Sequence, residues 1–276
     1  MISVLPTLGH VGPFVLYTFT VLIDLGIVAG LGWLYLSAKT DGVAQAGRWV
    51  DAGLAATLGG LIGARLGYVF ANWAYFGTHF GEAIRIWEGG LAWPGAIAGG
   101  AIVLWGYCRL RGESFWPIAD ALTFPILILA ALSWIGCATN ACAPGREAAP
   151  GMLPSWFTVD WPDAFGIKAL RWPTQIIGAV WSLLLIPGLW LVRDREWPIG
   201  ARPLLAIAGI ALGAFALAFT RGDQAPQLIG LRLDAVASGM VMVVSLFLFW
   251  RRWMPAARRK VGGNGNTPLQ VQSDHP

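Results

Sequence analysis

Three charged side chains interrupt long apolar stretches of this sequence: Asp24, Arg65 and Asp120. A charge within hydrocarbon costs roughly 3 kcal/mol on insertion scales, so such a residue usually faces a protein interior or a wet cavity. Arg65 lies within Gly63-Ala64-Arg65-Leu66-Gly67-Tyr68, where small residues allow close helix packing. Its planar guanidinium suits the phosphate of a lipid headgroup. A structural ion pair with Asp24 or Asp120 is the alternative interpretation.

A glycine pair between two tryptophans forms a second group, Trp87-Glu88-Gly89-Gly90-Leu91-Ala92-Trp93. Paired glycines permit unusual backbone angles and the close approach of a lipid, while tryptophans anchor a segment at the membrane interface. The pattern predicts an interfacial arm that leads into the next helix. An ordinary turn is the alternative.

A third group lies between Cys137 and Arg146. Asn140 can donate and accept hydrogen bonds, and Arg146 offers a planar fork that suits phosphate oxygens. Cys137 and Cys142 permit a disulfide, although unpaired cysteines often pack as small apolar residues. The three cysteines, which include Cys108, lack histidine partners at zinc-ligand spacing, so no metal site is predicted.

The fourth group, Arg171-Trp172-Pro173-Thr174-Gln175, directly precedes an apolar run. It indicates a polar collar, or only a helix entry, since proline is well suited to the first turn of a helix. Among the histidines, His79 is a weak catalytic candidate, because a lone histidine with no identified partner is more often incidental.

Helices that cross a membrane are needed to position these groups. Of the 276 residues, 56% are hydrophobic and only 12% are charged, about half the charged share usual in soluble domains. Seven apolar runs approach the length needed to span hydrocarbon, near 14–36, 52–73, 91–107, 118–134, 175–192, 204–219 and 235–250. We therefore expect an all-α, polytopic membrane protein with about seven transmembrane helices.

The basic residues predict the orientation, because cytoplasmic segments carry an excess of Lys and Arg. An odd number of spans with the N-terminus outside puts most of the 19 Lys and Arg on the inner side. We expect a transmembrane domain over residues 1–253, with outer-face loops at 72–90, 137–174 and 221–234. Residues 254–276 are expected to form a disordered, basic and polar cytoplasmic tail. No nucleic-acid partner is expected.

Taken in this order, the four groups resemble the prolipoprotein diacylglyceryl transferase family over about residues 12–250. The matches are Gly-Ala-Arg-Leu-Gly-Tyr at 63–68, Trp-Glu-Gly-Gly-Leu-Ala-Trp at 87–93, Asn140 with Gly145-Arg146, and Arg171-Trp172-Pro173-Thr174-Gln175. The resemblance implies seven helices in the bacterial plasma (inner) membrane, with the N-terminus outside. It implies transfer of a diacylglyceryl group from phosphatidylglycerol to the cysteine thiol of a lipoprotein precursor, releasing glycerol phosphate, with no cofactor.

The resemblance also implies that matching residues hold the headgroup or substrate. The expected catalytic residues are Glu88, Asn140 and Arg146. An active protein would need a rearranged set of polar residues, for which Arg146, Arg171, Glu88 and Arg221 are the candidates. Substrate binding is expected of Arg65, Gly89, Gly90, Trp93, Gly145, Arg171 and Gln175.

At several positions the chain departs from the family. Where the family usually has His, Arg and Tyr, this chain has Pro94, Trp134 and Phe19. The positions of an Arg and a Glu in the family correspond to Ala216 and Thr220. Because these departures remove a proton carrier and two cations, a non-catalytic lipid- or lipoprotein-binding membrane protein is the second hypothesis. A small-solute transporter, suggested by the intramembrane charges, is the third.

Overall fold

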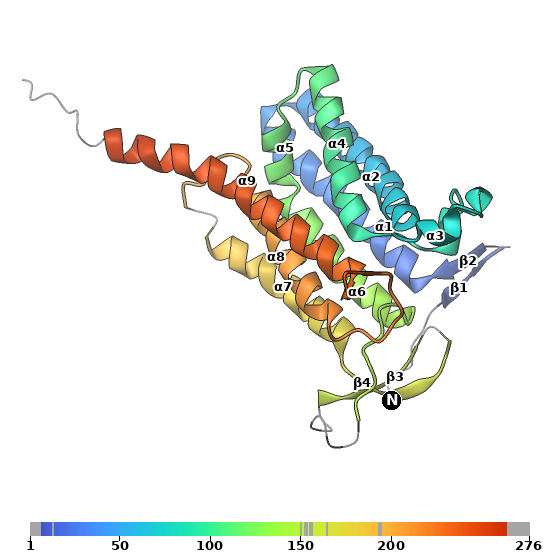
Figure 1. Ribbon diagram of the computed structural model, residues 1–276. Coiled ribbons are helices and arrows are strands. Elements are labelled where there is room, and N and C mark those ends of the chain that lie inside the picture. Colours follow the sequence, from blue (N-terminus) through green and yellow to red (C-terminus); the bar gives the residue numbers. More distant parts are fainter. Residues whose placement is uncertain are drawn as a thin grey trace, which may run out of the picture.

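Long helices run side by side and make up most of the protein (Figure 1). The computed structural model describes residues 7–12, 14–149, 151, 154, 157–163, 165–192 and 195–263. The helices are α1 (Thr18–Ala38), α2 (Val43–Ala71), α3 (Trp73–Phe76), α4 (Trp93–Arg111), α5 (Phe115–Ala121), α6 (Thr123–Thr139), α7 (Thr174–Leu191), α8 (Ala201–Ala218) and α9 (Leu233–Gly263).

Three short antiparallel hairpins accompany the helices in the described part of the chain. They are β1 (Thr7–Val11) with β2 (Phe14–Tyr17), β3 (Val159–Pro162) with β4 (Lys168–Arg171), and β5 (Gln227–Leu228) with β6 (Leu231–Arg232). The sequence predicted an all-α protein and did not predict these hairpins. Strands of two to five residues are too short to give a clear alternating pattern in the sequence.

Five of the described helices are long and apolar enough to cross a membrane: Thr18–Asp41, Val43–Ala71, Thr174–Leu191, Ala201–Ala218 and Leu233–Met254. The pair α5 and α6 adds a sixth if it is counted as one broken span, with a bend of 46°. Pro125 accounts for the break, because it has no N–H to donate to the carbonyl of Ala121 four residues earlier. Helix α4 overlaps the expected run at 91–107 from residue 93 onward but is not among these five or six candidates.

Helices α2 and α4 pack backbone against backbone through glycines. A Cβ on Gly63 of α2 would overlap the carbonyl oxygen of Gly95 in α4 and would lie 2.8 Å from the Cα of Gly99. Side chains cannot relieve such an overlap, because the colliding atoms belong to the main chain. Small residues spaced by four are the usual device for close helix contact in membranes, and here they bring Arg65 of α2 near the start of α4.

Helix α1 contacts both α2 and α6, so it separates the two parts of the bundle that carry the predicted site residues. Successive long helices alternate in direction, and this alternation puts the connections α2–α4, α6–α7 and α8–α9 at the same end of the bundle (Figure 1). We call it the loop end. Helix α9 continues past the expected boundary at residue 253 to Gly263, and residues 264–276 of the expected disordered tail lie outside the described residues.

The glycine contact gives a first testable prediction. Gly63→Ala should lower stability by about 1 to 3 kcal/mol, the usual cost of overpacking, because α2 and α4 must move apart. Thermal unfolding in detergent measures this change. The matched control is Gly47→Ala in the same helix, where a Cβ would meet nothing within 4 Å. Equal melting temperatures for the two variants would contradict the proposed role of the glycine contact.

Candidate functional site

The guanidinium of Arg65 is bonded to backbone carbonyls of the segment that joins α2 to α4. Arg65 is 7% exposed. Its Nε donates to the carbonyl of Ala83 at 2.8 Å, and its Nη2 donates to the carbonyl of Glu82 at 2.7 Å. Its Nη1 donates to the carbonyls of Gly89 at 2.5 Å and Gly90 at 3.2 Å. The buried cation is thus solvated by peptide dipoles, and four hydrogen bonds fix the path of the connecting segment.

We call this segment, residues 72–90, the arm. Gly89 and Gly90 have φ values of 87° and 74°, a region that L side chains rarely adopt. A Cβ on Gly90 would overlap the ring of Tyr68 and lie 2.9 Å from Nη1 of Arg65. The glycine pair therefore allows the arm to close on Arg65. Ile84 and Trp87 of the arm are each 75% exposed, which suits an interfacial segment.

The catalytic and binding roles expected in this part of the chain stay predictions. The side chain of Glu88 lies outside the described residues. Trp93 begins α4, and the N–H of Ala92 just before it donates to the carbonyl of Ala64 at 2.9 Å. The alternative for Arg65, an ion pair with Asp24 or Asp120, is wrong within the described residues, because the guanidinium donates to backbone carbonyls instead. Asp120 accepts a hydrogen bond from the N–H of Gly200 at 2.7 Å, just before α8.

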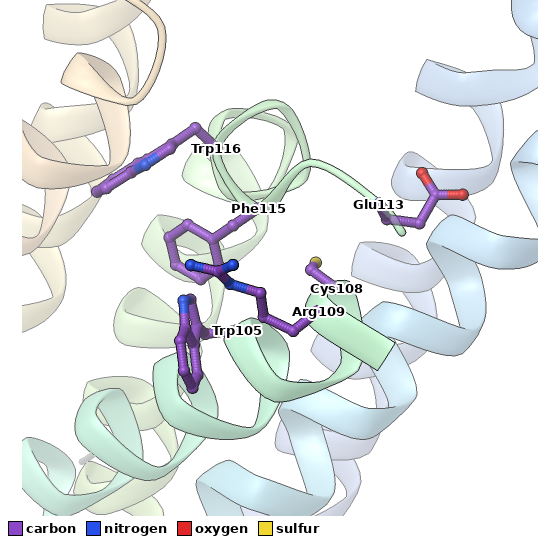
Figure 2. Close-up of a pocket in the computed structure, with 6 residues that line it drawn as sticks. All are labelled: Trp105, Cys108, Arg109, Glu113, Phe115 and Trp116. Atoms are coloured by element: carbon purple, nitrogen blue, oxygen red, sulfur yellow. The ribbon is translucent and has the colours of Figure 1, made fainter. Parts of the chain in front are cut away.

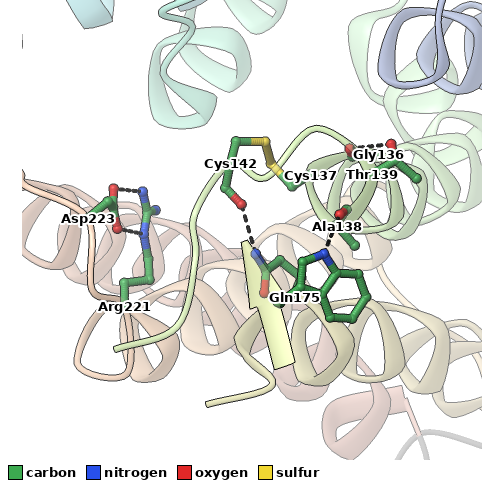
Figure 3. Close-up of a disulfide and its surroundings, with 9 residues drawn as sticks. Gly136, Cys137, Ala138, Thr139, Cys142, Gln175, Arg221 and Asp223 are labelled. Atoms are coloured by element: carbon green, nitrogen blue, oxygen red, sulfur yellow. Dashed lines mark hydrogen bonds and ion pairs between the residues drawn. A yellow bond between two sulfur atoms is a disulfide. The ribbon is translucent and has the colours of Figure 1, made fainter. Parts of the chain in front are cut away.

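Asn140 lies in a short loop after α6 that a disulfide closes. We call residues 137–146 the Asn140 loop. Cys137 and Cys142 are bonded to each other with their Cα atoms 4.7 Å apart, and the side-chain Nε2 of Gln175 donates to the carbonyl of Cys142 at 3.1 Å (Figure 3). Ala141 and Ala143 have φ values of 53° and 50°, uncommon for residues with a Cβ. The side chain of Asn140 is exposed.

The second half of the Asn140 loop is held between α7 and the α8–α9 connection. A Cβ on Gly145 would overlap the carbonyl oxygen of Trp172, so the close approach requires glycine. The N–H of Arg146 donates to the carbonyl of Thr220 at 2.8 Å. The exposed guanidinium of Arg146 lies 4.8 Å from the ring centroid of Trp172. A cation on a fixed backbone, with free N–H groups, can bind a phosphate.

Arg171 has a different environment from Arg146. It is 5% exposed and donates through Nη2 to Asp163 at 3.1 Å and Glu147 at 3.3 Å. Nη1 is 3.4 Å from the carbonyl of Gly145. These bonds join the β3–β4 hairpin to the Asn140 loop. The charge of Arg171 is compensated by the two carboxylates, and its predicted contact with substrate stays a prediction.

Four charged residues in the α8–α9 connection and the first turn of α9 form a cluster, of which the sequence had indicated only Arg221. Arg221 pairs with Asp223 at 2.5 Å and with Asp234 at 3.3 Å, and Arg232 pairs with the same carboxylates at 3.2 and 3.1 Å. Burial alone would raise the pKa of Asp223, but the hydrogen bond and charge of Arg221, with Arg232 nearby, lower it overall. The Arg-x-Asp spacing at 221–223 and 232–234 was the available signal.

Apolar packing occupies most of the positions at which the chain departs from the family it resembles. A Cβ on Gly136 would lie 2.6 Å from the ring of Phe19, and one on Gly178 would overlap the indole of Trp134. Pro94 lies in the first turn of α4. Thr220 is the polar exception, since its Oγ1 lies 3.0 Å from Oγ1 of Thr174.

The predicted site residues therefore fall into two groups at the loop end of the bundle. Arg65, Gly89 and Gly90 meet in the arm. The second group, in and around the Asn140 loop, contains Asn140, Gly145, Arg146, Arg171 and Gln175. Helix α1 packs between α2 and α6, and none of the hydrogen bonds or ion pairs described above joins the two groups. The arrangement supplies an exposed cation and an exposed amide at the Asn140 loop.

Comparison with known proteins gives consistent matches over most of the chain. Residues 6–251 match the family model described as prolipoprotein diacylglyceryl transferase. Relatives carrying the name phosphatidylglycerol--prolipoprotein diacylglyceryl transferase occur in Rhodococcus jostii, with 30% identity over 93% of this chain and 78% of the relative, and in Geobacillus kaustophilus, with 28% identity over 87% and 89%. The relative from Nocardia farcinica is 29% identical over 95% of this chain, which spans 57% of that protein.

The hydrogen bonds of Arg65 give a second prediction. Arg65→Lys should loosen the arm, because one ammonium cannot reach all the carbonyls spread around the edge of the planar guanidinium. We expect amide hydrogen exchange at residues 82–90 to rise about tenfold or more, since hydrogen bonds to charged groups are among the stronger ones. Gly81→Ala is the control, because a Cβ there meets nothing within 4 Å. Unchanged exchange in a folded Arg65→Lys protein would show that the arm does not depend on the guanidinium.

The disulfide gives a third prediction. Replacing both Cys137 and Cys142 by Ser should cost about 2 kcal/mol of stability, from the loop-closure entropy of a very short loop. We also expect faster amide exchange within the Asn140 loop. A reductant should reproduce both effects in the wild-type protein and should leave the double variant unchanged, which controls for the buried free thiol of Cys108. Full stability of the double variant would contradict the prediction.

Proposed function

The chain belongs to the prolipoprotein diacylglyceryl transferase family, and we propose that it transfers the diacylglyceryl group of phosphatidylglycerol to the cysteine thiol of a lipoprotein precursor. The observation that carries this proposal is the family match over residues 6–251 together with the Asn140 loop. In this loop, residues that match the family pattern are held on a cross-linked backbone, with the cation of Arg146 exposed.

The proposed reaction forms one bond and breaks one. The sulfur of the precursor cysteine, deprotonated by a base, attacks the glyceryl carbon that bears the phosphate ester. A thioether forms while the carbon–oxygen bond breaks, and glycerol phosphate leaves with the bonding electrons. The developing negative charge on the phosphate needs a nearby cation that is already in place.

We assign that role to Arg146, with Asn140 as a hydrogen-bond donor to the phosphate or to the precursor backbone. Arg146 suits the role because its guanidinium is exposed and, within the described residues, has no ion pair. Glu88 is the proposed proton acceptor, on the evidence of the sequence alone. Arg65 acts through the arm that it orders, and Arg171 and Gln175 act by holding the Asn140 loop.

The proposed topology completes this assignment. We propose seven spans, with α4 as the third and the α5–α6 pair as one broken span, the N-terminus outside and the C-terminus in the cytoplasm. The bacterial inner membrane is the proposed location. The loop end would then face the outside, where precursors arrive after export and where a disulfide is stable.

A second function is favoured by the apolar side chains at Phe19, Trp134 and Ala216. These residues pack or face outward where the family usually has polar groups, so the chain could bind a phospholipid or a precursor without performing the transfer. The lipid-binding surface at the loop end would be the same in both cases.

A transfer assay separates the two functions and gives a fourth prediction. Purified protein is incubated with phosphatidylglycerol vesicles and a peptide that carries a lipoprotein-precursor cysteine, and the diacylglyceryl thioether is measured by mass spectrometry. We expect product from the wild type and a loss of about a hundredfold in Arg146→Gln, the typical effect of removing one donor that stabilises a transition-state anion. Lys168→Gln, an exposed cation at the same end, is the control and should retain activity.

The remaining outcomes are also decisive. Phosphatidylglycerol binding without product in the wild type would establish the non-catalytic function. Full activity of Arg146→Gln would remove Arg146 from the mechanism while leaving the family assignment intact. If the wild-type protein neither binds phosphatidylglycerol nor forms product, both functions are wrong.

A further inference from the structure

The cavity lined by Trp105, Cys108, Arg109, Glu113, Phe115 and Trp116 lies far from the Asn140 loop. It has a volume of about 330 Å³ and lies where the C-terminal end of α4 meets the start of α5 (Figure 2). We call it the α4–α5 pocket. Helix α4 starts beside the arm and has 19 residues, so its far end is roughly 28 Å away at 1.5 Å per residue. The pocket is therefore separate from the site proposed for transfer.

The pocket combines aromatic walls with one uncompensated cation. The guanidinium of Arg109 lies 5.3 Å from the ring centroid of Trp105 and beside the ring of Phe115 (Figure 2). Arg109 is exposed and, within the described residues, forms no hydrogen bond or ion pair through its side chain. Stacking on an aromatic face leaves the N–H groups in the guanidinium plane free to bind oxygen atoms.

The carboxylate in the pocket lining does not cancel this charge. The side chain of Glu113 points away from Arg109, toward α2 (Figure 2). Its Oε1 is 2.6 Å from Nε of Arg48, and its Oε2 accepts a hydrogen bond from Nε2 of Gln45 at 3.0 Å. Because Glu113 is paired with Arg48, it leaves the guanidinium of Arg109 without a carboxylate partner in the pocket.

A second cation borders the pocket from α9. The guanidinium of Arg252 lies 3.5 Å from the ring centroid of Trp116 and donates to the carbonyl of Ile199 at 2.6 Å. This contact holds one wall of the pocket against α9. Basic residues gather at this end of the bundle, and such residues between membrane helices attract anionic lipid headgroups.

The surface around the pocket is apolar. Leu110 is 89% exposed, Ile102 is 67% exposed and Trp105 is 53% exposed, all on α4. In a protein with five or six apolar helices long enough to cross a membrane, such a surface faces acyl chains. An occupant must therefore present an anion to Arg109 and hydrocarbon to the outer surface of α4. A free phosphate meets only the first requirement.

We propose that the α4–α5 pocket binds the headgroup of an anionic phospholipid from the leaflet that surrounds this end of the bundle. The lipid phosphate binds Arg109, the glycerol lies against Trp105 and Phe115, and the acyl chains follow the exposed face of α4. The size of the pocket suits a headgroup, since small-molecule sites begin near 300 Å³. The bound lipid joins α4 to α5 and stabilises the bundle at the end opposite the proposed transfer site.

The test uses full-length protein in vesicles that contain photoreactive phosphatidylserine, an anionic lipid that is not the proposed donor. Its reactive group lies on the acyl chain near the glycerol, and adducts are mapped by mass spectrometry. We expect adducts at residues 102–116, and about fivefold fewer in Arg109→Gln, the usual effect of one cation near the surface. Arg111→Gln is the matched control, because it lies over Tyr107 at 6.0 Å and does not line the pocket.

Competition between the photoreactive lipid and unlabelled lipids for the wild-type protein gives an independent measurement, and it does not depend on the folding of any variant. Unlabelled anionic lipid should displace the label, whereas phosphatidylcholine should not. Arg146→Gln should label normally, which separates this pocket from the proposed transfer site. Equal labelling by photoreactive phosphatidylcholine, full labelling of Arg109→Gln, or displacement by millimolar inorganic phosphate alone would each overturn the proposal.

Discussion

A buried cation must be surrounded by acceptors, and the segment that joins α2 to α4 at the loop end depends on how Arg65 meets that requirement. Its four carbonyl partners belong to residues 82, 83, 89 and 90, so solvating one guanidinium fixes the second half of the arm, which leads into α4. The glycine pair at 89–90 and the glycine contact between α2 and α4 are then needed for steric reasons, because both place main chain close to Arg65.

The sequence predicted the positions of the helices well, since apolar runs of membrane length are a strong signal. Each of the seven expected runs overlaps a helix or the bent α5–α6 pair. The short hairpins and the α5–α6 bend were not predicted, because they depend on local turns and on one proline. The continuation of α9 from residue 254 to Gly263 was also not predicted, although the Ala and Arg residues in this stretch favour helix.

The sequence identified which residues belong to the candidate site, but it did not predict the hydrogen bonds and ion pairs that surround each of them. The sequence identified Arg65, Arg146 and Arg171 alike, since each is a planar cation within one of the four groups of residues that match the family pattern. The structure separates them by compensation: Arg65 is satisfied by carbonyls, Arg171 by two carboxylates, and Arg146 only by the face of an indole. No sequence pattern available from one chain distinguishes these cases, because the partners of Arg171 come from segments 8 and 24 residues away.

The degree of compensation separates cations that organise the fold from cations that can bind a ligand. A guanidinium surrounded by carbonyls or carboxylates has few N–H groups left, and exposing it would cost those bonds. A guanidinium stacked on an indole is oriented by the contact between the two faces, while the N–H donors in the guanidinium plane stay free. Arg146 over Trp172 and Arg109 over Trp105 share this arrangement at opposite ends of the bundle. The same interaction thus explains why Arg146 and Arg109 are suited to a phosphate, whereas the buried and compensated Arg65 and Arg171 are not.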